Sequence, residues 1–277
     1  MTYMKSDSLK INTSGELKFI SFPKLDATNM VANAFSTRFG GVSEGIYESM
    51  NFSFSNGDKE ENVRKNYEII CSALKVEPQN LTLSHQTHTD NIRIINEDDI
   101  GKGFSKPRDY DDVDALITNI PKVCLVTQFA DCVPLLFLDK EKKVIAAAHA
   151  GWKGTVAQIG LKTVNKMCEH FGCEPKNIIA AIGPSIMQCC YEVDDPVIDG
   201  FKKIDYINLD DIATQKPNGR YMLNLTKANQ LILEHAGIKT ENIDINDLCT
   251  CCNADTFHSH RKTNGLRGNN AAFIALR

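Results

Sequence analysis

Three stretches of the chain place apolar residues at helical spacing. The first follows Asp58, which could cap it, and has apolar residues at positions 63, 67, 70, 71 and 74. The second runs from about Thr155 to Phe171 and ends at Gly172. The third runs from about Leu225 to Ala236 and ends at Gly237. The spacing therefore predicts three amphipathic helices.

Short runs rich in β-branched residues lie between these helices and predict strands. These runs are Ile92–Ile95, Val123–Thr127, Leu135–Leu138, Val144–Ala148, Ile178–Ile182 and Ala272–Leu276. Helices and strands alternate irregularly, and some strands follow one another directly, which favours an α+β fold with mixed sheets over a strict βαβ repeat. No linker rich in Pro, Gly or Ser divides the chain, so we expect a single domain over residues 1–277.

Charge and cysteine content narrow the class of protein. The net charge of −4 at pH 7 includes no basic excess, which argues against nucleic acid or an anionic membrane as the main partner. The sequence has no apolar run of membrane-spanning length, and residues 1–20 lack the apolar segment of a signal peptide. The 10 cysteines therefore indicate a cytoplasmic protein with reduced thiols, some of which could bind metal.

The segment richest in candidate chemistry lies between positions 123 and 155. Two apolar runs, 135–138 and 144–148, flank an almost wholly charged stretch, which predicts a β-hairpin. If Leu138 pairs with Val144, His149 falls opposite Val133, next to Cys132. Cys132 and His149 should therefore meet at the open end of the hairpin.

A thiol and an imidazole at one place allow three interpretations. They could be two of the three ligands of a catalytic zinc, a Cys–His nucleophilic pair, or a buried thiol beside a hydrogen-bonded histidine. Asp131 could orient a metal-bound imidazole or cap a turn. A third ligand could come from His85 or His88, which face opposite sides of a strand, and their spacing does not distinguish them.

Basic residues beside glycines are candidates for anion binding. Arg38 lies next to a glycine pair, and Lys153 lies between two glycines at the start of the second helix. The polar stretch from His258 through Arg261 to Gly268 could supply further anion contacts. For Arg38, a solvated surface turn is the default alternative.

Two groups of cysteines resemble metal clusters at first sight. They are Cys189–Cys190 and the group formed by Cys249, Cys251 and Cys252. Neither group contains the two paired C-x-x-C halves of a zinc ribbon. This favours buried thiols, or a reversible disulfide between the two groups, over a structural zinc.

Taken together, these segments resemble the YfiH-like family, whose members are described as multicopper polyphenol oxidases (laccases), zinc-dependent purine nucleoside phosphorylases or a peptidoglycan editing factor. The resemblance extends from about residue 30 to residue 277, which leaves about residues 1–29 as an N-terminal lead-in. The matching motifs are S-T-R-F-G-G-V-S at 36–43, S-M-N at 49–51, G-D at 57–58, Q-T-H at 86–88, A-D-C-V-P at 130–134, A-H-A-G-W-K-G at 148–154, I-G-P-S-I at 182–186, C-Y-E-V at 190–193, C-T at 249–250, H-S-H-R at 258–261 and G-L-R-G at 265–268.

The resemblance implies a metal site made of His88, Cys132 and His149, with Zn²⁺ favoured over copper. The sequence departs from the family's pattern at Thr89, where glycine is common, and at Lys153, where the family commonly has an arginine that could bind an anion bidentately. His260 occupies a position that varies between Tyr and His in the family, next to Arg261.

The implied activity is phosphorolysis of adenosine, inosine, guanosine or methylthioadenosine, giving the free base and ribose 1-phosphate. Phosphate would be bound by Arg38, and Arg261 or Lys153 would assist. Zinc-activated water could also attack C6 of adenine, which is adenosine deamination. The pattern is equally compatible with a monomer and a weak homodimer.

Three other functions are compatible with the same residues. An amidase that edits a peptidoglycan precursor could use zinc-activated water or Cys132 as the nucleophile. Copper-dependent phenol oxidation is less favoured, because a laccase needs many more histidine ligands than 7 scattered ones readily provide. A non-catalytic module with a structural zinc would unfold on metal removal.

Overall fold

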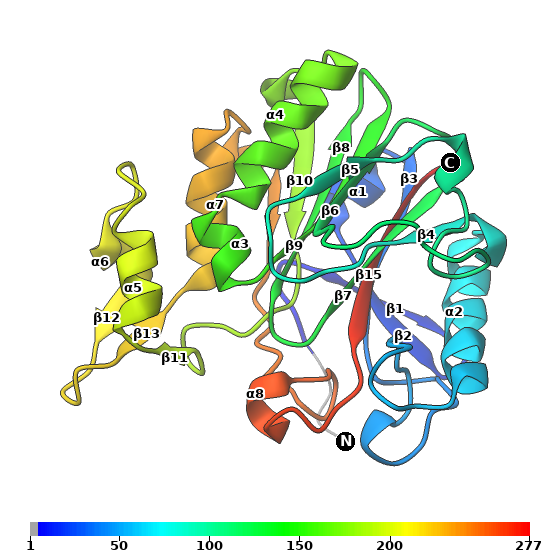
Figure 1. Ribbon diagram of the computed structural model, residues 1–277, viewed down its shortest axis with the longest axis horizontal. Helices are drawn as coiled ribbons and strands as arrows, with labels where there is room; N and C mark the ends of the chain where they lie inside the picture. The colour runs from blue at the N-terminus through cyan, green and yellow to red at the C-terminus, as the bar shows by residue number, and fades with distance from the viewer. Residues whose placement is uncertain (1–4) are drawn as a thin grey trace.

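Two six-stranded mixed sheets lie face to face at the centre of the molecule, in a computed structural model that describes residues 5–277 (Figure 1). The first sheet has the order β1 (Lys10–Ser14), β2 (Leu17–Ser21), β3 (Val31–Ser36), β15 (Asn270–Leu276), β7 (Cys124–Phe129) and β4 (Leu81–Leu83). The second has the order β14 (Ile243–Ile245), β10 (Ile178–Ile182), β8 (Val133–Asp139), β9 (Val144–Ala150), β6 (Ala115–Thr118) and β5 (Ile92–Ile94).

Helices cover the outer face of each sheet. The helices are α1 (Pro23–Ala27), α2 (Glu60–Leu74), α3 (Trp152–Val156), α4 (Ile159–Phe171), α5 (Asp195–Phe201), α6 (Leu209–Ile212), α7 (Leu225–His235) and α8 (His260–Thr263). Helix α2 packs on the first sheet, whereas α4 and α7 pack on the second (Figure 1). A small sheet of β11 (Glu192–Val193), β13 (Tyr221–Leu223) and β12 (Ala213–Gln215) lies with α5 and α6 at one end of the molecule (Figure 1).

Three apolar cores hold these layers together. One lies between the two sheets, where Phe129 and Ile274 of the first sheet join Leu136 and Ile145 of the second. The other two lie under α2 and under α4 and α7. Each sheet is therefore buried on both faces, which explains why β8 and β9 are buried along their whole length and carry mostly apolar residues rather than an alternating pattern. The α+β fold with mixed sheets is confirmed.

The three helices expected from the spacing are present, with two corrections. The first begins after Lys59, not at Asp58, because the Asp58 carboxylate accepts hydrogen bonds from Ser43 and Asn51 instead of capping the helix. The second begins earlier, at Trp152, and is broken into α3 and α4 by Gln158, whose φ of 60° is left-handed. Its apolar spacing continues across the break because both pieces pack on the same side of the second sheet.

All six expected strands are present, but the hairpin register is one residue away from the expected one. Leu138 pairs with Ile145, and His149 therefore lies opposite Pro134. The turn is closed by Asp139, whose carboxylate accepts the backbone amides of residues 141 and 142. Cys132 lies immediately before β8, so the open end of the hairpin still brings it close to His149.

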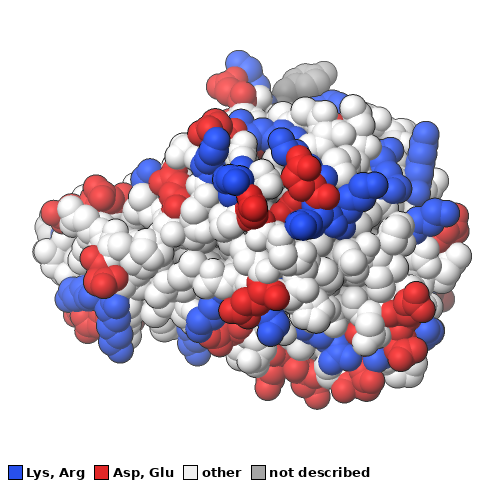
Figure 2. All heavy atoms as spheres, turned by 90° about the horizontal axis from the view of Figure 1, so that it is seen from above, with Lys and Arg blue, Asp and Glu red and all other residues white. Residues whose placement is uncertain are grey.

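The molecular surface carries charges of both signs. On the face shown in Figure 2, lysines and arginines are interspersed with aspartates and glutamates. Within residues 5–277, none of the helices combines the length and the apolar character needed to span a membrane.

Candidate metal centre

His88, Cys132 and His149 come together although they lie in three separate segments. His88 is in the loop between β4 and β5, Cys132 immediately precedes β8, and His149 belongs to β9. One possible ligand atom from each lies within 4.8 Å of the others, and Cys132 Sγ is 3.8 Å from His88 Nε2. His85 points elsewhere, with Nδ1 3.0 Å from a carboxylate oxygen of Asp111.

A carboxylate that the sequence analysis did not single out organises this group. Asp114, which is fully buried, lies 2.7 Å from His149 Nδ1 through Oδ1. The same carboxylate accepts the backbone amides of Thr87, His88 and Thr89 and the Thr89 hydroxyl, at 2.9–3.2 Å. It therefore fixes the His149 ring and the segment that carries His88 at the same time. The sequence suggested Asp131 as the residue that orients a metal-binding imidazole, but Asp114 makes this hydrogen bond to His149.

Strand pairing explains the position of Asp114. In the antiparallel β6–β9 pair, Ala115 lies opposite Ala148, so the residues just beyond them, Asp114 and His149, are also neighbours. The amide of His149 donates to the Asp114 carbonyl at 2.8 Å, which continues the ladder by one step. The only sequence signal was an acidic residue directly before an apolar run, which by itself does not identify a partner.

The protonation states follow from these contacts. Burial alone would raise the pKa of Asp114, but the hydrogen bond from His149 and the backbone amides outweigh it and hold the pKa at about 2. An ionised Asp114 keeps a proton of His149 on Nδ1, so Nε2 is the nitrogen available to a metal. Burial lowers the pKa of His149, but Cys132 and Asp114 outweigh it and raise the pKa to about 9, so a metal would displace the proton on Nε2. Burial opposes ionisation of the Cys132 thiol, but the charges and hydrogen bonds of His149 and His88 lower its pKa, which favours the thiolate.

Gly151 is needed for space at this site. A Cβ atom there would lie 2.9 Å from His88 Cδ2 and 3.1 Å from Cys132 Sγ. Its φ of −67° is available to any residue, so close approach, not backbone conformation, requires glycine. The glycine of the A-H-A-G-W motif thus lets α3 begin directly against the three side chains.

Two imidazoles and one thiolate form a donor set suited to a transition metal. Zinc and copper both accept nitrogen and sulfur ligands, and three protein ligands leave a further position for substrate or water, as in catalytic zinc sites. Metal-binding histidines generally donate their second ring nitrogen to a carboxylate or carbonyl, and Asp114 is that partner for His149. The donor set therefore fits a metal, which His88, Cys132 and His149 would hold.

A cavity of about 610 Å³ opens onto this group. His88, Cys132 and His149 form part of its wall. Three phenylalanines and several cationic side chains also line it, namely Phe54, Phe104, Phe129, Arg64, Lys106, Arg108 and Arg267. The volume is typical of sites for small organic ligands.

The anion-binding residues expected from the sequence are not part of this cavity wall. Arg38 donates to the carbonyls of Glu48 and Ala254, and Arg261 donates to those of Cys190 and Glu192. Lys153 lies over the ring of its neighbour Trp152. Arg267, within the polar C-terminal stretch, does line the cavity.

Asp131 is positioned through other contacts. Its buried carboxylate accepts the Thr250 hydroxyl at 2.6 Å and the Arg261 amide at 2.7 Å, and its backbone has a left-handed φ of 86°. These bonds fix the turn that presents Cys132, the next residue. Asp131 therefore acts as the turn-fixing residue, which was the second interpretation of its sequence position.

Comparison with known proteins identifies the class. The sequence profile of the family described as multi-copper polyphenol oxidoreductase laccase matches residues 32–277, and the chain belongs to this family. It is 38% identical over 251 residues to purine nucleoside phosphorylase YlmD of Bacillus subtilis (strain 168), covering 89% of each chain. It is 34% identical over 251 residues to adenosine deaminase RL5 of an unknown prokaryotic organism, covering 88% of this chain and 94% of that one.

A solved structure has the same fold. The crystal structure of the hypothetical protein YfiH of Bacillus licheniformis superposes with a TM-score of 0.91 and 32% sequence identity. The match covers 98% of this chain and 100% of that one. The resemblance to the YfiH-like family stated from the sequence motifs is thereby confirmed.

Proposed function

We propose that the protein is a zinc-dependent purine nucleoside phosphorylase, which converts a purine nucleoside and phosphate into the free base and ribose 1-phosphate. One observation carries the proposal. The candidate metal ligands and a partly buried arginine, Arg267, line the same cavity, whose volume of about 610 Å³ suits a nucleoside and phosphate. The names of similar proteins, such as YlmD of Bacillus subtilis, support this reaction class.

The cavity offers binding groups for both substrates. Phe54 and Phe104, which are only partly buried, provide aromatic surface for a planar base. Arg267 and Arg108 provide guanidinium groups, which bind phosphate oxygens with two parallel hydrogen bonds. Arg38, Lys153 and Arg261 are further proposals from the family resemblance, and they would act from outside this wall.

In the proposed reaction a phosphate oxygen attacks C1′ of the ribose while the bond from C1′ to the purine nitrogen breaks and its electron pair leaves with the base. The arginines would hold phosphate in place and offset its charge. A zinc ion bound by His88, Cys132 and His149 would supply a Lewis acid to this site. Asp114 would hold the His149 ring in its metal-binding tautomer.

Adenosine deamination is the second candidate, favoured by the similarity to adenosine deaminase RL5. Both reactions start from the same nucleoside, so the products separate them. Phosphorolysis yields adenine and ribose 1-phosphate and requires phosphate, whereas deamination yields inosine and ammonia without it.

The test is incubation of purified, zinc-loaded protein with adenosine, with and without phosphate, followed by chromatography of the products. We expect adenine only when phosphate is present, and we expect Cys132→Ala to lose the activity together with the zinc ion bound at this site. Full zinc content together with full activity in Cys132→Ala would contradict the site. Product formation from amide substrates without phosphate, and none from nucleosides, would favour the peptidoglycan-editing alternative.

A further inference from the structure

A second group of potential metal ligands lies outside the candidate metal centre. Cys189 and Cys190 belong to the loop that follows β10, and Cys249 and Cys252 to the loop that follows β14. Strands β10 and β14 are parallel neighbours, so both loops leave the same edge of the second sheet. A further bridge between Ser185 and Cys249 holds the loops together beyond the strands.

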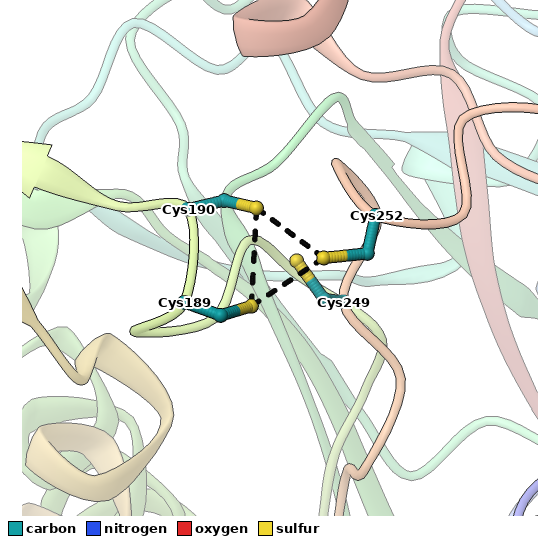
Figure 3. A group of neighbouring side chains, drawn as sticks. All are labelled: Cys189, Cys190, Cys249 and Cys252. Carbon is teal, nitrogen blue, oxygen red and sulfur yellow. Dashed lines mark hydrogen bonds between the residues drawn. The ribbon is translucent and has the colours of Figure 1, made fainter.

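The four thiols of this second group, the four-cysteine cluster, converge on one point (Figure 3). All four sulfur atoms lie within 4.8 Å of one another. Cys252 Sγ lies 3.3 Å from Cys190 Sγ and 3.5 Å from Cys189 Sγ, and the sulfurs of Cys189 and Cys190 are 3.8 Å apart. A tetrahedral zinc with Zn–S bonds of 2.3 Å would space its sulfurs by about 3.8 Å. The cluster is therefore near the size of a zinc site.

We propose that the four-cysteine cluster is a second, structural Zn²⁺ site with tetrathiolate coordination. Each thiol gives up one proton and contributes one sulfur, so four protons leave and the ZnS₄ group carries a charge of −2. Four sulfur ligands complete the tetrahedron, so this site would be closed to substrate.

The surroundings of the cluster suit a negatively charged metal–thiolate group. The backbone amide of Met187 donates to Cys249 Sγ at 3.4 Å. Amide donors stabilise thiolate ligands in this way. None of the ten cysteines, all within the described residues, forms a disulfide.

Only half of the cluster has a recognisable spacing. Cys249 and Cys252 form one C-x-x-C pair, whereas the other two ligands are adjacent in sequence. Cys251, between the members of the pair, is outside the four-cysteine cluster and packs with Ile186. The chain thus contains a matched control, one cysteine next to a proposed ligand that is not itself a ligand.

The proposed site would support the candidate metal centre from a distance. The two bridged loops hold Asp131, since the amide of Ile186 donates to its carbonyl at 2.9 Å and the Thr250 hydroxyl donates to its carboxylate. Asp131 in turn fixes the turn that presents Cys132. Zinc between the loops would therefore stabilise the position of a ligand of the other site.

The test is metal analysis of protein purified under reducing conditions, which does not depend on the proposed enzyme activity. We expect two zinc ions per chain in the wild type, one in Cys252→Ser and two in Cys251→Ser. Cys132→Ala should retain one zinc, and its cobalt-substituted form should show strong thiolate-to-cobalt charge transfer that disappears in the double variant Cys132→Ala/Cys252→Ser. If Cys252→Ser does not fold, Cys189→Ser, which changes an exposed residue, replaces it in the metal analysis and should also bind one zinc ion.

Three results would overturn the proposal. The first is a metal-free Cys132→Ala that is folded by circular dichroism. The second is a metal-free protein whose measured mass is two hydrogens below that of the fully reduced chain and returns to that value on reduction, because this assigns two of the sulfurs to a disulfide. The third is equal zinc content in Cys252→Ser and Cys251→Ser. If the wild-type protein binds two zinc ions but does not cleave nucleosides, the result contradicts the proposed function and leaves the second zinc site standing.

Discussion

The carboxylate of Asp114 lies 2.7 Å from Nδ1 of His149 and also accepts the amides of residues 87–89. One buried side chain thus connects two of the three candidate metal ligands. Because Asp114 is ionised, it determines which ring nitrogen of His149 carries the proton. The metal-binding ability of the site should depend on a residue that does not touch the metal.

Replacing Asp114 should weaken metal binding. In Asp114→Asn the negative charge is lost, and the new side-chain NH₂ group faces N–H donors that need an acceptor. We therefore expect the zinc affinity to fall by about 10- to 100-fold. Competition with a chromogenic chelator measures this change. Asp112→Asn is the matched control. The Asp112 carboxylate accepts the Thr87 hydroxyl, its backbone carbonyl accepts the Thr89 hydroxyl, and asparagine tolerates its left-handed φ of 54°. Equal affinities in the two variants would show that Asp114 has no special role.

Adding one methyl group at Gly151 should disturb the metal centre more than the fold. In Gly151→Ala the new Cβ meets His88 Cδ2 and Cys132 Sγ, so the ligands must separate. We expect reduced zinc content with native circular dichroism. In Gly219→Ala the new Cβ has no neighbour within 4 Å but takes a left-handed φ of 82°. That control should lower the melting temperature slightly, by the equivalent of about 1 kcal/mol, and keep its zinc. Normal zinc content in Gly151→Ala would refute the steric argument.

Arg267 should contribute to phosphate binding if the proposed function is correct. A guanidinium–phosphate interaction contributes about 1.5–3 kcal/mol, so Arg267→Gln should raise the KM for phosphate by at least about tenfold. The KM for the nucleoside should change much less. Arg220→Gln is a suitable control, because Arg220 pairs with Glu192 in the small sheet and does not line the cavity. An unchanged phosphate KM in Arg267→Gln would shift attention to Arg38, Lys153 and Arg261.

Asp99 should make stability depend on pH in the acid range. Burial opposes its ionisation, but hydrogen bonds from Arg93 and Lys102, both at 2.8 Å, outweigh this and lower its pKa below the ordinary value of 3.8. The carboxylate therefore stabilises the fold above pH 3.8, and this contribution is lost as the pH falls through the lowered pKa.

Asp99→Asn should consequently destabilise the protein at pH 7 by about 2 kcal/mol, since two buried charge-assisted hydrogen bonds are weakened. The difference in melting temperature from the wild type should shrink toward pH 3. Asp98→Asn, in the same turn but with an exposed carboxylate, should match the wild type at both pH values. A constant difference between Asp99→Asn and the wild type across this range would contradict the charge-based explanation.

The sequence by itself determined the local elements and the position of the chemistry. The apolar spacing of α2 and α7, and the charged turn between two apolar runs of the β8–β9 hairpin, depend on neighbours in the chain and were predicted from it. The hairpin also placed Cys132 near His149, because a register error of one residue does not separate two residues at its open end.

Only the tertiary structure decided which distant residues complete these sites. Asp114 reaches His149 through pairing of β6 with β9, and no spacing along the chain encodes that pairing. Likewise, Cys189 and Cys249 are brought together because β10 and β14 are parallel neighbours whose loops leave the same edge. Helical and hairpin contacts are local and follow from periodicity, whereas strand order depends on packing of the whole chain. Whether a cysteine lies among other potential metal ligands is therefore decided by the sheet, not by its motif.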